Sequence, residues 1–374
     1  MMAVREPVND RAWMARALEL AARGRGLTSP NPMVGAVVVR DGTVVGEGWH
    51  ARAGAPHAEI EALARAGPGA RGATLYVNLE PCGHHGRTPP CVPALVEAGL
   101  ARIVAALEDP DPRVAGRGLA ALRAAGIPVE TGVLADEAAR LNRVFLTAMR
   151  EGRPHVTLKA AASLDGRIAD LHGVSRWITG DPARAHAHRL RADADAIVVG
   201  ITTALRDDPA LTVRLAQPWP REPWRVVLDT HARLPVDAQL LRSGAPARAL
   251  VAVSAAAPDT RVSALQATGA TVVRVTARQG RVDVQALLAE LFAREVRGVL
   301  VEGGGEVHGS FVDAALVDRV ALFLGPLLLG GRTAPSLLGG SGRELKAAVR
   351  LETLEVQRLG DDLLVEGDVV REGH

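Results

Sequence analysis

The first 150 residues alternate between apolar patterns with helical spacing and apolar patterns with strand spacing. After Asn9 or Asp10 the spacing predicts an amphipathic helix whose apolar face is Trp13, Met14, Ala17, Leu18 and Ala21. Two apolar runs, 34–39 and 43–49, flank Arg40-Asp41-Gly42 and predict a β-hairpin. Further strands are expected at 73–79, 102–107 and 127–133, and further helices at 57–66, 91–98, 118–125 and 136–150. This alternation predicts a layered α/β domain with helices on both faces of a sheet.

A Gly/Pro break at 150–154 interrupts the pattern, which then starts again. Strands are expected at 155–163, 196–200, 224–229, 248–254, 271–276, 298–302 and 319–325, and helices at 182–192, 282–295 and 307–316. A final pair of apolar runs, 351–358 and 361–369, resembles an antiparallel hairpin closed by Leu359-Gly360. The simplest organisation is therefore two α/β domains, residues 1–151 and 152–374.

Composition narrows the class of protein. With 48% hydrophobic residues, the chain of 374 residues has enough apolar side chains for sizeable cores, which excludes wholesale disorder. A net charge of +2 and ten aromatic residues (five Trp, one Tyr, four Phe) offer little surface for binding nucleic acid. The longest stretch without charge, 26–39, has 14 residues and two prolines, whereas a membrane span needs roughly 20 apolar residues. The first residues lack an apolar signal core, so the expected location is the cytoplasm.

The only two cysteines, Cys82 and Cys91, lie in one short segment, which favours a metal or reactive site over a disulfide framework. With His57 they supply the three protein ligands of a catalytic zinc, which keeps one position open for water. Glu59 follows the histidine in the H-x-E…P-C arrangement of nucleobase deaminases. In that chemistry the metal lowers the pKa of its water towards neutrality, and hydroxide attacks the carbon that bears the exocyclic amine. Glu59 then carries the proton to the departing ammonia.

Simpler interpretations of the same residues exist. Two cysteines separated by eight residues are often small buried hydrophobic side chains, and a histidine at a helix start is often a cap. A structural zinc is a further alternative, because His84 or His85 would complete a cage of four ligands. His-Ala-Glu at a helix start and Glu-Pro-Cys after a strand occur together and in order, which favours the catalytic site.

The cysteine spacing departs from the C-x-x-C of most zinc deaminases, because eight residues intervene here. The resulting segment, C-G-H-H-G-R-T-P-P-C at 82–91, closely resembles the deaminase of riboflavin biosynthesis. Two further segments resemble the same family: T-S-P-N-P-M-V-G at 28–35 and V-G-E-G-W-H-A-R-A-G-A-P-H-A-E at 45–59. The resemblance covers nearly the whole first domain. It implies a cytidine-deaminase-like three-layer α/β/α fold, with catalytic Glu59 and the zinc ligands His57, Cys82 and Cys91.

In the second half, the expected strand at 298–302 runs into Gly303-Gly304-Gly305 and then a helix. Glycine backbone at a helix N-terminus readily binds phosphate groups. A tight strand-to-helix turn without a ligand explains the same residues equally well, and the G-x-G-x-x-G fingerprint is absent here.

Three other segments resemble the pyrimidine reductase of the same pathway, which uses NADPH and has a dihydrofolate-reductase-like fold. They are K-A-A-A-S-L-D-G-R-I-A at 159–169, S-R-W-I-T at 175–179 and D-D-P-A-L-T-V-R at 207–214. The resemblance implies NADPH contacts at Ala161, Trp177, Thr203, Asp207, Thr230, Gly304, Gly305, Glu306, Val307, His308, Gly309 and Ser310. It implies substrate contacts at Ser175, Arg191, Leu211, Arg214 and Glu302.

Arg191 and Arg214 carry the forked donors that suit a sugar phosphate. Lys159 and Lys346 are the only lysines, so 44 − 2 = 42 of the basic residues are arginine, and a surface role for either arginine stays open.

The whole chain thus resembles the bifunctional deaminase–reductase family of riboflavin biosynthesis. The family implies zinc-dependent hydrolytic deamination of 2,5-diamino-6-ribosylamino-4(3H)-pyrimidinone 5′-phosphate in the first domain, with one zinc per chain. It implies NADPH-dependent reduction of the ribosyl group of 5-amino-6-(5-phosphoribosylamino)uracil to ribityl in the second. It also implies phosphorylated pyrimidine substrates and a homo-oligomer, a dimer or larger. Two alternatives are a zinc deaminase of a nucleotide or tRNA base with a reductase-like domain of other specificity, and a zinc-stabilised module that binds nucleic acid.

Overall fold

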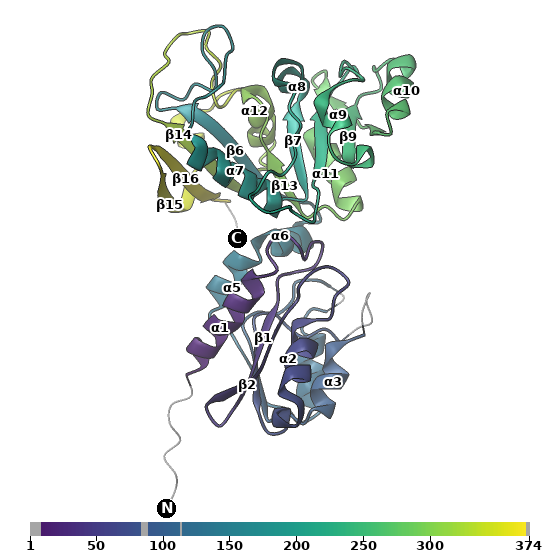
Figure 1. The fold of residues 1–374 in the computed structure, drawn as a ribbon, viewed down its shortest axis with the longest axis vertical. Helices are drawn as coiled ribbons and strands as arrows, with labels where there is room; N and C mark the ends of the chain where they lie inside the picture. Colours follow the sequence, from purple (N-terminus) through teal and green to yellow (C-terminus); the bar gives the residue numbers. More distant parts are fainter. Residues whose placement is uncertain (1–8, 84–88, 113, 372–374) are drawn as a thin grey trace, which may run out of the picture. The chain divides into compact units, whose positions relative to one another are not determined.

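The computed structural model describes residues 9–83, 89–112 and 114–371 and divides the chain into two compact units, Met1–Gly152 and Arg153–His374. Each unit has its own large sheet (Figure 1), and each is treated separately below. Among the helices in these ranges, none has both the length and the apolar composition that crossing a bilayer requires.

The first unit is built on a five-stranded sheet in the order β2-β1-β3-β4-β5. Its strands are β1 (Gly35–Arg40), β2 (Thr43–Trp49), β3 (Thr74–Val77), β4 (Arg102–Ala105) and β5 (Val129–Thr131). β1 pairs antiparallel with β2, as the turn between them predicts, and also antiparallel with β3. β3, β4 and β5 are parallel, so their carboxyl ends share one edge of the sheet.

Helices cover both faces of this sheet, which confirms the predicted three-layer arrangement (Figure 1). On one face, α1 (Asp10–Ala22) and α5 (Ala135–Leu141) pack apolar side chains such as Leu20 and Ala138 against the strands. The other face is covered by α2 (Ala58–Ala66), α3 (Cys91–Glu97) and α4 (Arg117–Ala124), with the 3₁₀ turn η1 (Gly67–Ala70).

The helix predicted at 136–150 is in fact two helices, α5 and α6 (Arg143–Glu151), separated at Asn142. The Asn142 side chain accepts the N–H of Met33 at 2.8 Å and donates to the C=O of Met33 at 2.9 Å. Asparagine readily exchanges helical backbone bonds for bonds to other main-chain groups. Because this partner is distant in sequence, the local apolar pattern does not reveal the break.

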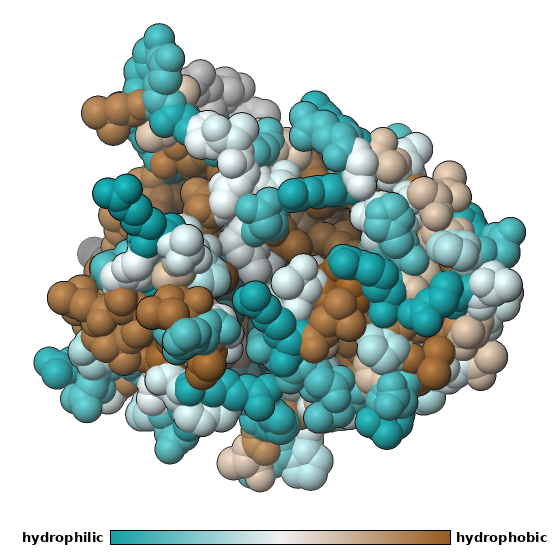
Figure 2. All heavy atoms as spheres, turned by 90° about the horizontal axis from the view of Figure 1, so that it is seen from above, coloured by the Kyte–Doolittle hydropathy of each residue, from teal (hydrophilic) through white to brown (hydrophobic). Residues whose placement is uncertain are grey.

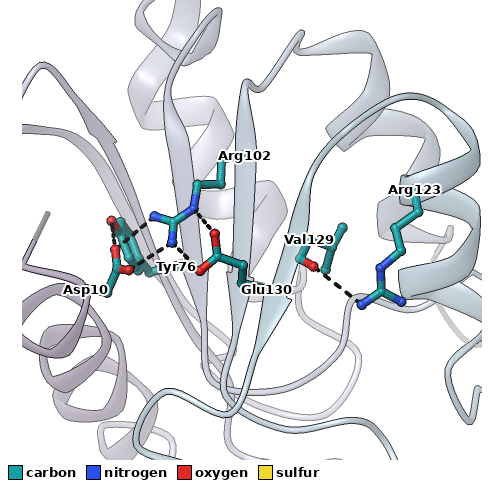
Figure 3. A network of polar contacts seen from close by, with 6 residues as sticks. All are labelled: Asp10, Tyr76, Arg102, Arg123, Val129 and Glu130. Carbon is teal, nitrogen blue, oxygen red and sulfur yellow. Dashed lines mark hydrogen bonds and ion pairs between the residues drawn. The ribbon is translucent and has the colours of Figure 1, made fainter. Parts of the chain in front are cut away.

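Arg102 on β4 ties α1 to the sheet (Figure 3). Its guanidinium donates to both carboxylate oxygens of Asp10, at 2.8 and 2.9 Å, and to those of Glu130 on β5, at 2.6 and 2.9 Å. The Tyr76 hydroxyl on β3 donates to Asp10 at 2.7 Å. Hydrogen bonding from Arg102 outweighs burial and lowers the pKa of Asp10. The first residue of α1 is thereby fixed against three neighbouring strands.

The second unit is built on a nine-stranded sheet in the order β10-β9-β8-β7-β13-β6-β14-β16-β15. Its strands are β6 (His155–Ser163), β7 (Ala196–Gly200), β8 (Trp224–Leu228), β9 (Ala249–Val253), β10 (Thr271–Arg274), β13 (Gly298–Val301), β14 (Arg319–Gly325), β15 (Leu351–Leu359) and β16 (Asp362–Val369). The strands from β10 to β14 in this order are parallel, and β16 and β15 are antiparallel, as the predicted terminal hairpin requires. A short separate hairpin joins β11 (Ala277–Arg278) and β12 (Arg281–Val282).

Helices lie on both faces of this sheet as well (Figure 1). One face carries α7 (Asp181–Asp193), α8 (Ile201–Asp207), α9 (Gln239–Arg242) and α10 (Asp259–Ala267), and the other carries α11 (Val284–Ala293) and α12 (Gly305–Asp313). The 3₁₀ turns η2 (Pro246–Arg248) and η3 (Leu345–Ala347) complete the elements. The sequence pattern did not predict α8 or α10; α10 buries only Val262 and Leu265, too few positions to establish a helical period.

Candidate active sites

Three side chains converge at one edge of the first sheet, where two helices begin. His57 is the N-cap of α2, and Cys91 is the first residue of α3. Cys82 follows β3, and its C=O accepts the N–H groups of Cys91 and Val92 at 3.1 and 3.2 Å, which fixes the Cys82 segment on the start of α3. The candidate ligand atoms of the three side chains all lie within 4.8 Å of one another.

The chemistry of this group fits zinc. The Nδ1 atom of His57 lies 3.2 Å from Sγ of Cys91 and 3.5 Å from Sγ of Cys82. A hydrogen bond from Cys91, with a further one from His57, lowers the pKa of the Cys82 thiol despite burial, which favours the thiolate form that binds metal. Two sulfurs and one imidazole nitrogen leave the fourth tetrahedral position free of these ligands. His84 and His85, the alternative fourth ligands, lie outside the described residues.

Glu59 lies in the first turn of α2, beside the three ligands, and is 3% exposed. Burial raises the pKa of its carboxyl, although His57 and other neighbours partly oppose that effect. A buried carboxyl group with a raised pKa binds a proton more readily than an exposed one, which suits a general acid–base.

His50 and Asn31 also lie at this site, although no role was predicted for them. The His50 ring lies 5.5 Å from the His57 ring and at an interplanar angle of 83°. The Nδ1 atom of His50 is 3.1 Å from the C=O of Pro56, and Nε2 is 3.1 Å from Nδ2 of Asn31. These partners require Nδ1 to carry the proton and Nε2 to accept, so His50 is neutral, and burial lowers its pKa in agreement. Both residues belong to the segments at 28–35 and 45–59 that carry the family resemblance.

The buried carboxylate of Glu80, two residues before Cys82, binds the backbone of the segment 109–119. It accepts four backbone N–H groups, those of Asp109, Gly116, Gly118 and Leu119, at 2.8 to 3.2 Å. A side chain on Gly118 would place its Cβ 1.9 Å from the C=O of Pro81, so only glycine allows this contact. The loop that follows β4 is thus held directly against the residue before Cys82.

In the second unit, the predicted substrate residues Arg191 and Glu302 form a buried ion pair. Glu302 follows β13, and Arg191 reaches it from α7 with Nε and Nη2 at 2.6 and 2.7 Å from the two carboxylate oxygens. The two side chains are 14% and 7% exposed. Burial alone would raise the pKa of Glu302, but the charge and hydrogen bonds of Arg191, with Lys159 nearby, lower it to about 2.

Lys159 on β6 faces the same ion pair, and no role was predicted for it. Its Nζ lies 5.5 Å from the ring centroid of Phe323, and burial lowers its pKa despite the opposing effect of Glu302. The sequence contained a signal, since Lys159 is one of only two lysines and is the only formally charged residue besides His155 in this strand.

Arg214 lies near this cluster through His188, which stands one turn before Arg191 on α7. The N–H of Arg214 donates to Nδ1 of His188 at 3.2 Å, and Nε of Arg214 lies 3.3 Å from Nε2. Burial, followed by the charges of Arg191 and Arg214, lowers the pKa of His188 to about 4, so the ring is neutral. Arg214 is exposed, whereas the fork of Arg191 is occupied by Glu302 and its Nη1 donates to the C=O of Thr212 at 3.1 Å.

The glycine turn after β13 meets α8 at the carboxyl edge of the sheet. Gly304 has a φ of +47°, and a Cβ there would lie 3.3 Å from Oγ1 of Thr203, which places these two predicted cofactor residues side by side. Gly303 lies against β7, since its Cβ would come within 2.5 Å of the Cα of Val199. Open backbone at the start of α12 therefore faces a hydroxyl, an arrangement suited to phosphate.

The remaining predicted residues differ in their solvent exposure. Trp177 is 65% exposed, with the guanidinium carbon of Arg184 4.2 Å from its ring centroid. Ala161, Ser175, Asp207, Thr230, Val307 and Ser310 are half-buried, and Glu306 is exposed. His308 and Leu211 are buried: Nδ1 of His308 contacts the C=O of Leu337 at 2.8 Å, and Leu211 packs in the core beneath α8. These two residues have almost no surface that a ligand could reach.

The fold and site of the first unit are those of a zinc-dependent deaminase. Those of the second unit are those of a reductase of the dinucleotide-dependent α/β class. Family comparisons agree: residues 7–107 match the cytidine and deoxycytidylate deaminase zinc-binding region, and residues 154–365 match the RibD C-terminal domain.

Relatives match over almost the whole chain. The riboflavin biosynthesis protein RibD of Escherichia coli strain K12 is 43% identical, covering 95% of this chain and 98% of its own length. The RibD of Bacillus amyloliquefaciens is 43% identical over 94% of both chains. The structure of Acinetobacter baumannii RibD (form 1) superposes with a TM-score of 0.87 at 39% identity, covering 97% of this chain and 99% of its own. The chain belongs to the RibD family.

Family membership confirms the predicted fold class and the two activities. The chain is a bifunctional deaminase and reductase of riboflavin biosynthesis. Its first unit has the cytidine-deaminase-like fold with a His/Cys/Cys zinc group, and its second has the dihydrofolate-reductase-like fold that uses NADPH.

The Arg191–Glu302 pair gives a prediction about stability and pH. Because the folded pKa of Glu302 lies at about 2, below its ordinary 4.5, the pair stabilises the fold above pH 4.5. That stability is lost as pH falls through about 2. A shift of this size corresponds to roughly 3 kcal/mol. Glu302→Gln should lower the free energy of unfolding of the second unit by roughly this amount at pH 7 and by less at pH 3. Urea titration with hydrogen exchange of β13 as the reporter measures both values.

Glu290→Gln is the matched control, because Glu290 pairs with Arg294 one turn away on the surface of α11. Exposed pairs of this kind contribute only ~0.3–0.5 kcal/mol. Equal losses from both substitutions, or a Glu302→Gln loss that does not shrink at low pH, would show that the buried charge is not the source of the stability.

Proposed function

We propose that the first unit deaminates 2,5-diamino-6-ribosylamino-4(3H)-pyrimidinone 5′-phosphate, with His57, Cys82 and Cys91 as zinc ligands. The observation that carries the proposal is the convergence of these three side chains beside the buried carboxyl of Glu59. A deaminase/reductase of Thermotoga maritima named for this diaminopyrimidine substrate is 35% identical and superposes with a TM-score of 0.81. Zinc, when bound, makes water nucleophilic at neutral pH.

In this proposal Glu59 moves the protons of the reaction. It accepts a proton from the attacking water, passes it to the pyrimidine ring and delivers a proton to the amine that leaves as ammonia. The neutral His50 ring beside the ligands keeps its orientation through Pro56 and Asn31 and leaves proton transfer to Glu59.

We propose that the second unit, Arg153–His374, reduces the ribosyl group of 5-amino-6-(5-phosphoribosylamino)uracil to ribityl. NADPH, when bound, supplies the hydride. The turn Gly304–Ser310, with Thr203 beside it, is suited to the phosphates of the cofactor. The residues around the Arg191–Glu302 pair would hold the sugar phosphate. Since Glu302 occupies the fork of Arg191, the exposed guanidinium of Arg214 is the better phosphate ligand.

We further propose that the enzyme acts in the cytoplasm as a dimer or larger assembly. Support comes from an apolar sheet face at β14, β16 and β15, where Leu322, Val365 and Val356 lie in register and Val356 is 67% exposed. Figure 2 shows hydrophobic side chains gathered at the surface on the left. β15 also ends the sheet, so its outer backbone groups are unpaired within the sheet. A second copy of the chain would cover both features.

Glu59→Gln should abolish deamination and keep zinc, because an amide fills the same space but cannot carry protons. General acid–base catalysis contributes ~10²–10⁴-fold, and Glu59 serves several transfers, so a loss of at least that size is expected. Ammonia release from the diamino substrate measures activity. Metal analysis and X-ray absorption should show about one zinc per chain, with two sulfur ligands and one imidazole nitrogen, in both wild type and variant.

Glu61→Gln on the same helix is the control, since Glu61 pairs only with Arg65 at the surface in the described contacts. It should retain deamination, and both variants should oxidise NADPH normally with the deaminated substrate. Near-normal ammonia release by Glu59→Gln would remove Glu59 from the mechanism. Loss of zinc from a variant carrying both His84→Ala and His85→Ala would indicate a closed structural cage instead of a catalytic site.

Arg214→Lys should raise KM for the ribosylaminouracil phosphate more than KM for NADPH, because lysine cannot reproduce the two parallel donors of arginine. A bidentate charged contact contributes roughly 1.5–3 kcal/mol, so an increase of about tenfold or more is expected. Steady-state absorbance at 340 nm gives both constants. Arg189→Lys, an exposed arginine on α7, is the control and should change neither. An increase confined to KM for NADPH would assign Arg214 to the cofactor.

Wild-type protein should sediment with at least twice the mass of one chain, 39.2 kDa. Val356→Glu places a charge on the apolar face of β15 and should shift the protein towards single chains. Gln357→Glu, exposed on the opposite face of the same strand, should leave the assembly intact. Analytical ultracentrifugation of the three proteins distinguishes these outcomes, and single chains in the wild type would overturn the proposed assembly.

A further inference from the structure

The segment 326–340, here called the strap, leaves β14 and runs along the turn that follows β6. No helix or regular strand forms within it. Main-chain and side-chain bonds tie it to that turn: Leu164 N–H to Leu327 C=O at 2.9 Å, Ile168 N–H to Pro335 C=O at 3.0 Å, Leu337 N–H to Gly166 C=O at 3.0 Å, and Arg167 Nη1 to Ala334 C=O at 2.9 Å. The strap is therefore held by hydrogen bonds to residues 164–168 at Leu327 and again at 334–337.

The far end of the strap packs directly on the start of α12. The N–H of Gly339 donates to the C=O of Gly305 at 2.9 Å, and His308 contacts Leu337 as described above. A Cβ on Gly305 would lie 2.3 Å from the C=O of Ser336, and one on Gly309 would lie 2.5 Å from the carbonyl carbon of Gly339. Both glycines are thus required by the approach of the strap, and both belong to the turn proposed to bind the cofactor phosphates.

Asp165, in the turn after β6, binds the tip of the strap at Leu329 and Gly330. Its carboxylate accepts the hydroxyl of Ser163 at 2.6 Å and the N–H groups of Leu329 and Gly330 at 3.0 and 2.6 Å. Gly330 has a φ of +66°, which lets the tip of the strap turn its N–H groups towards the carboxylate. These hydrogen bonds lower the pKa of Asp165 to about 2, so it is ionised throughout the physiological range.

Hydrophobic packing does not hold this tip of the strap. Leu328, next to the residues that Asp165 binds, is 74% exposed. A segment with few buried apolar contacts depends on its hydrogen bonds for its position. Among the described contacts, the Asp165 carboxylate is the only charged acceptor that holds the tip.

We propose that Asp165 is a positioning residue of the reductase: it holds the strap, and the strap holds the turn Gly304–Ser310 in the geometry that binds the phosphates of NADPH. The proposal rests on the proposed function of that turn. Asp165 has no part in hydride transfer, and its effect reaches the cofactor through residues 327–340 and the backbone of α12.

The test is NADPH binding to the full-length, zinc-loaded protein, measured by calorimetry. Asp165→Asn keeps the shape of the side chain but replaces one acceptor oxygen with a donor, so at least one of its three donors loses its partner. The lost bond is one to a charged group, which is stronger than a bond between neutral groups. If most of its contribution reaches the turn, Kd for NADPH should rise about tenfold.

Asp170→Asn is the matched control. Asp170 is also a carboxylate with a lowered pKa in the loop after β6, and it accepts the N–H groups of His172 and Val174 at 2.8 and 2.9 Å. Those partners belong to its own turn and not to the strap, so its Kd for NADPH should stay within about twofold of wild type.

Further readouts separate positioning from general stability. Asp165→Asn should speed hydrogen exchange at 304–312 and leave deamination, KM for the pyrimidine and kcat at saturating NADPH close to wild type. Gly309→Ala, which displaces the strap from its other end, should raise Kd for NADPH in the same way. If wild type binds NADPH and Asp165→Asn binds it equally well, the strap proposal is wrong. If wild type does not bind NADPH, the proposed function itself fails.

Discussion

The molecule depends on one geometric constraint: parallel strands end at a common edge, and the helices that follow them begin there. In the first unit that edge carries the start of α3 and the segment after β3, so Cys91 and Cys82 meet the N-cap of α2. In the second unit the ends of β6, β7 and β13 bring residues far apart in sequence around the start of α12. Each site is therefore built where helices begin beside the carboxyl ends of parallel strands.

Buried carboxylates are stabilised in two different ways at these edges. Glu80 binds four main-chain N–H groups and no cation among the described contacts, and its effect is to fix a loop. Glu302 is paired with Arg191 and lies near Lys159, so its charge depends on side chains that themselves face the site. The first arrangement is rigid because main-chain donors have fixed directions. The second is adjustable because a ligand phosphate can compete for the same cations.

The zinc site could be predicted from the sequence because its chemistry is local in each segment. His57 and Glu59 stand two residues apart at a helix start, and Cys82 and Cys91 are the only cysteines, so few other combinations exist. The reductase site could be placed only through the family resemblance, since forty-two arginines make any single arginine uninformative. Contacts to the main chain of distant residues could not be predicted from the sequence. Nothing in the local pattern distinguishes Asn142, which breaks a helix by binding Met33, from an ordinary polar helix position.

Close backbone approaches explain why glycine occurs repeatedly at the turn between β13 and α12 and in the first turns of α12. A Cβ at Gly303 would strike β7, one at Gly305 would strike Ser336, and one at Gly309 would strike Gly339. The glycine run at 303–305, which sequence analysis could interpret as either a phosphate cradle or a tight turn, is a tight turn in the structure, and phosphate binding there is the proposal made above. The turn is tight because β7 and the strap pack closely against it. The close packing and the proposed phosphate binding both need the missing side chains, so neither interpretation excludes the other.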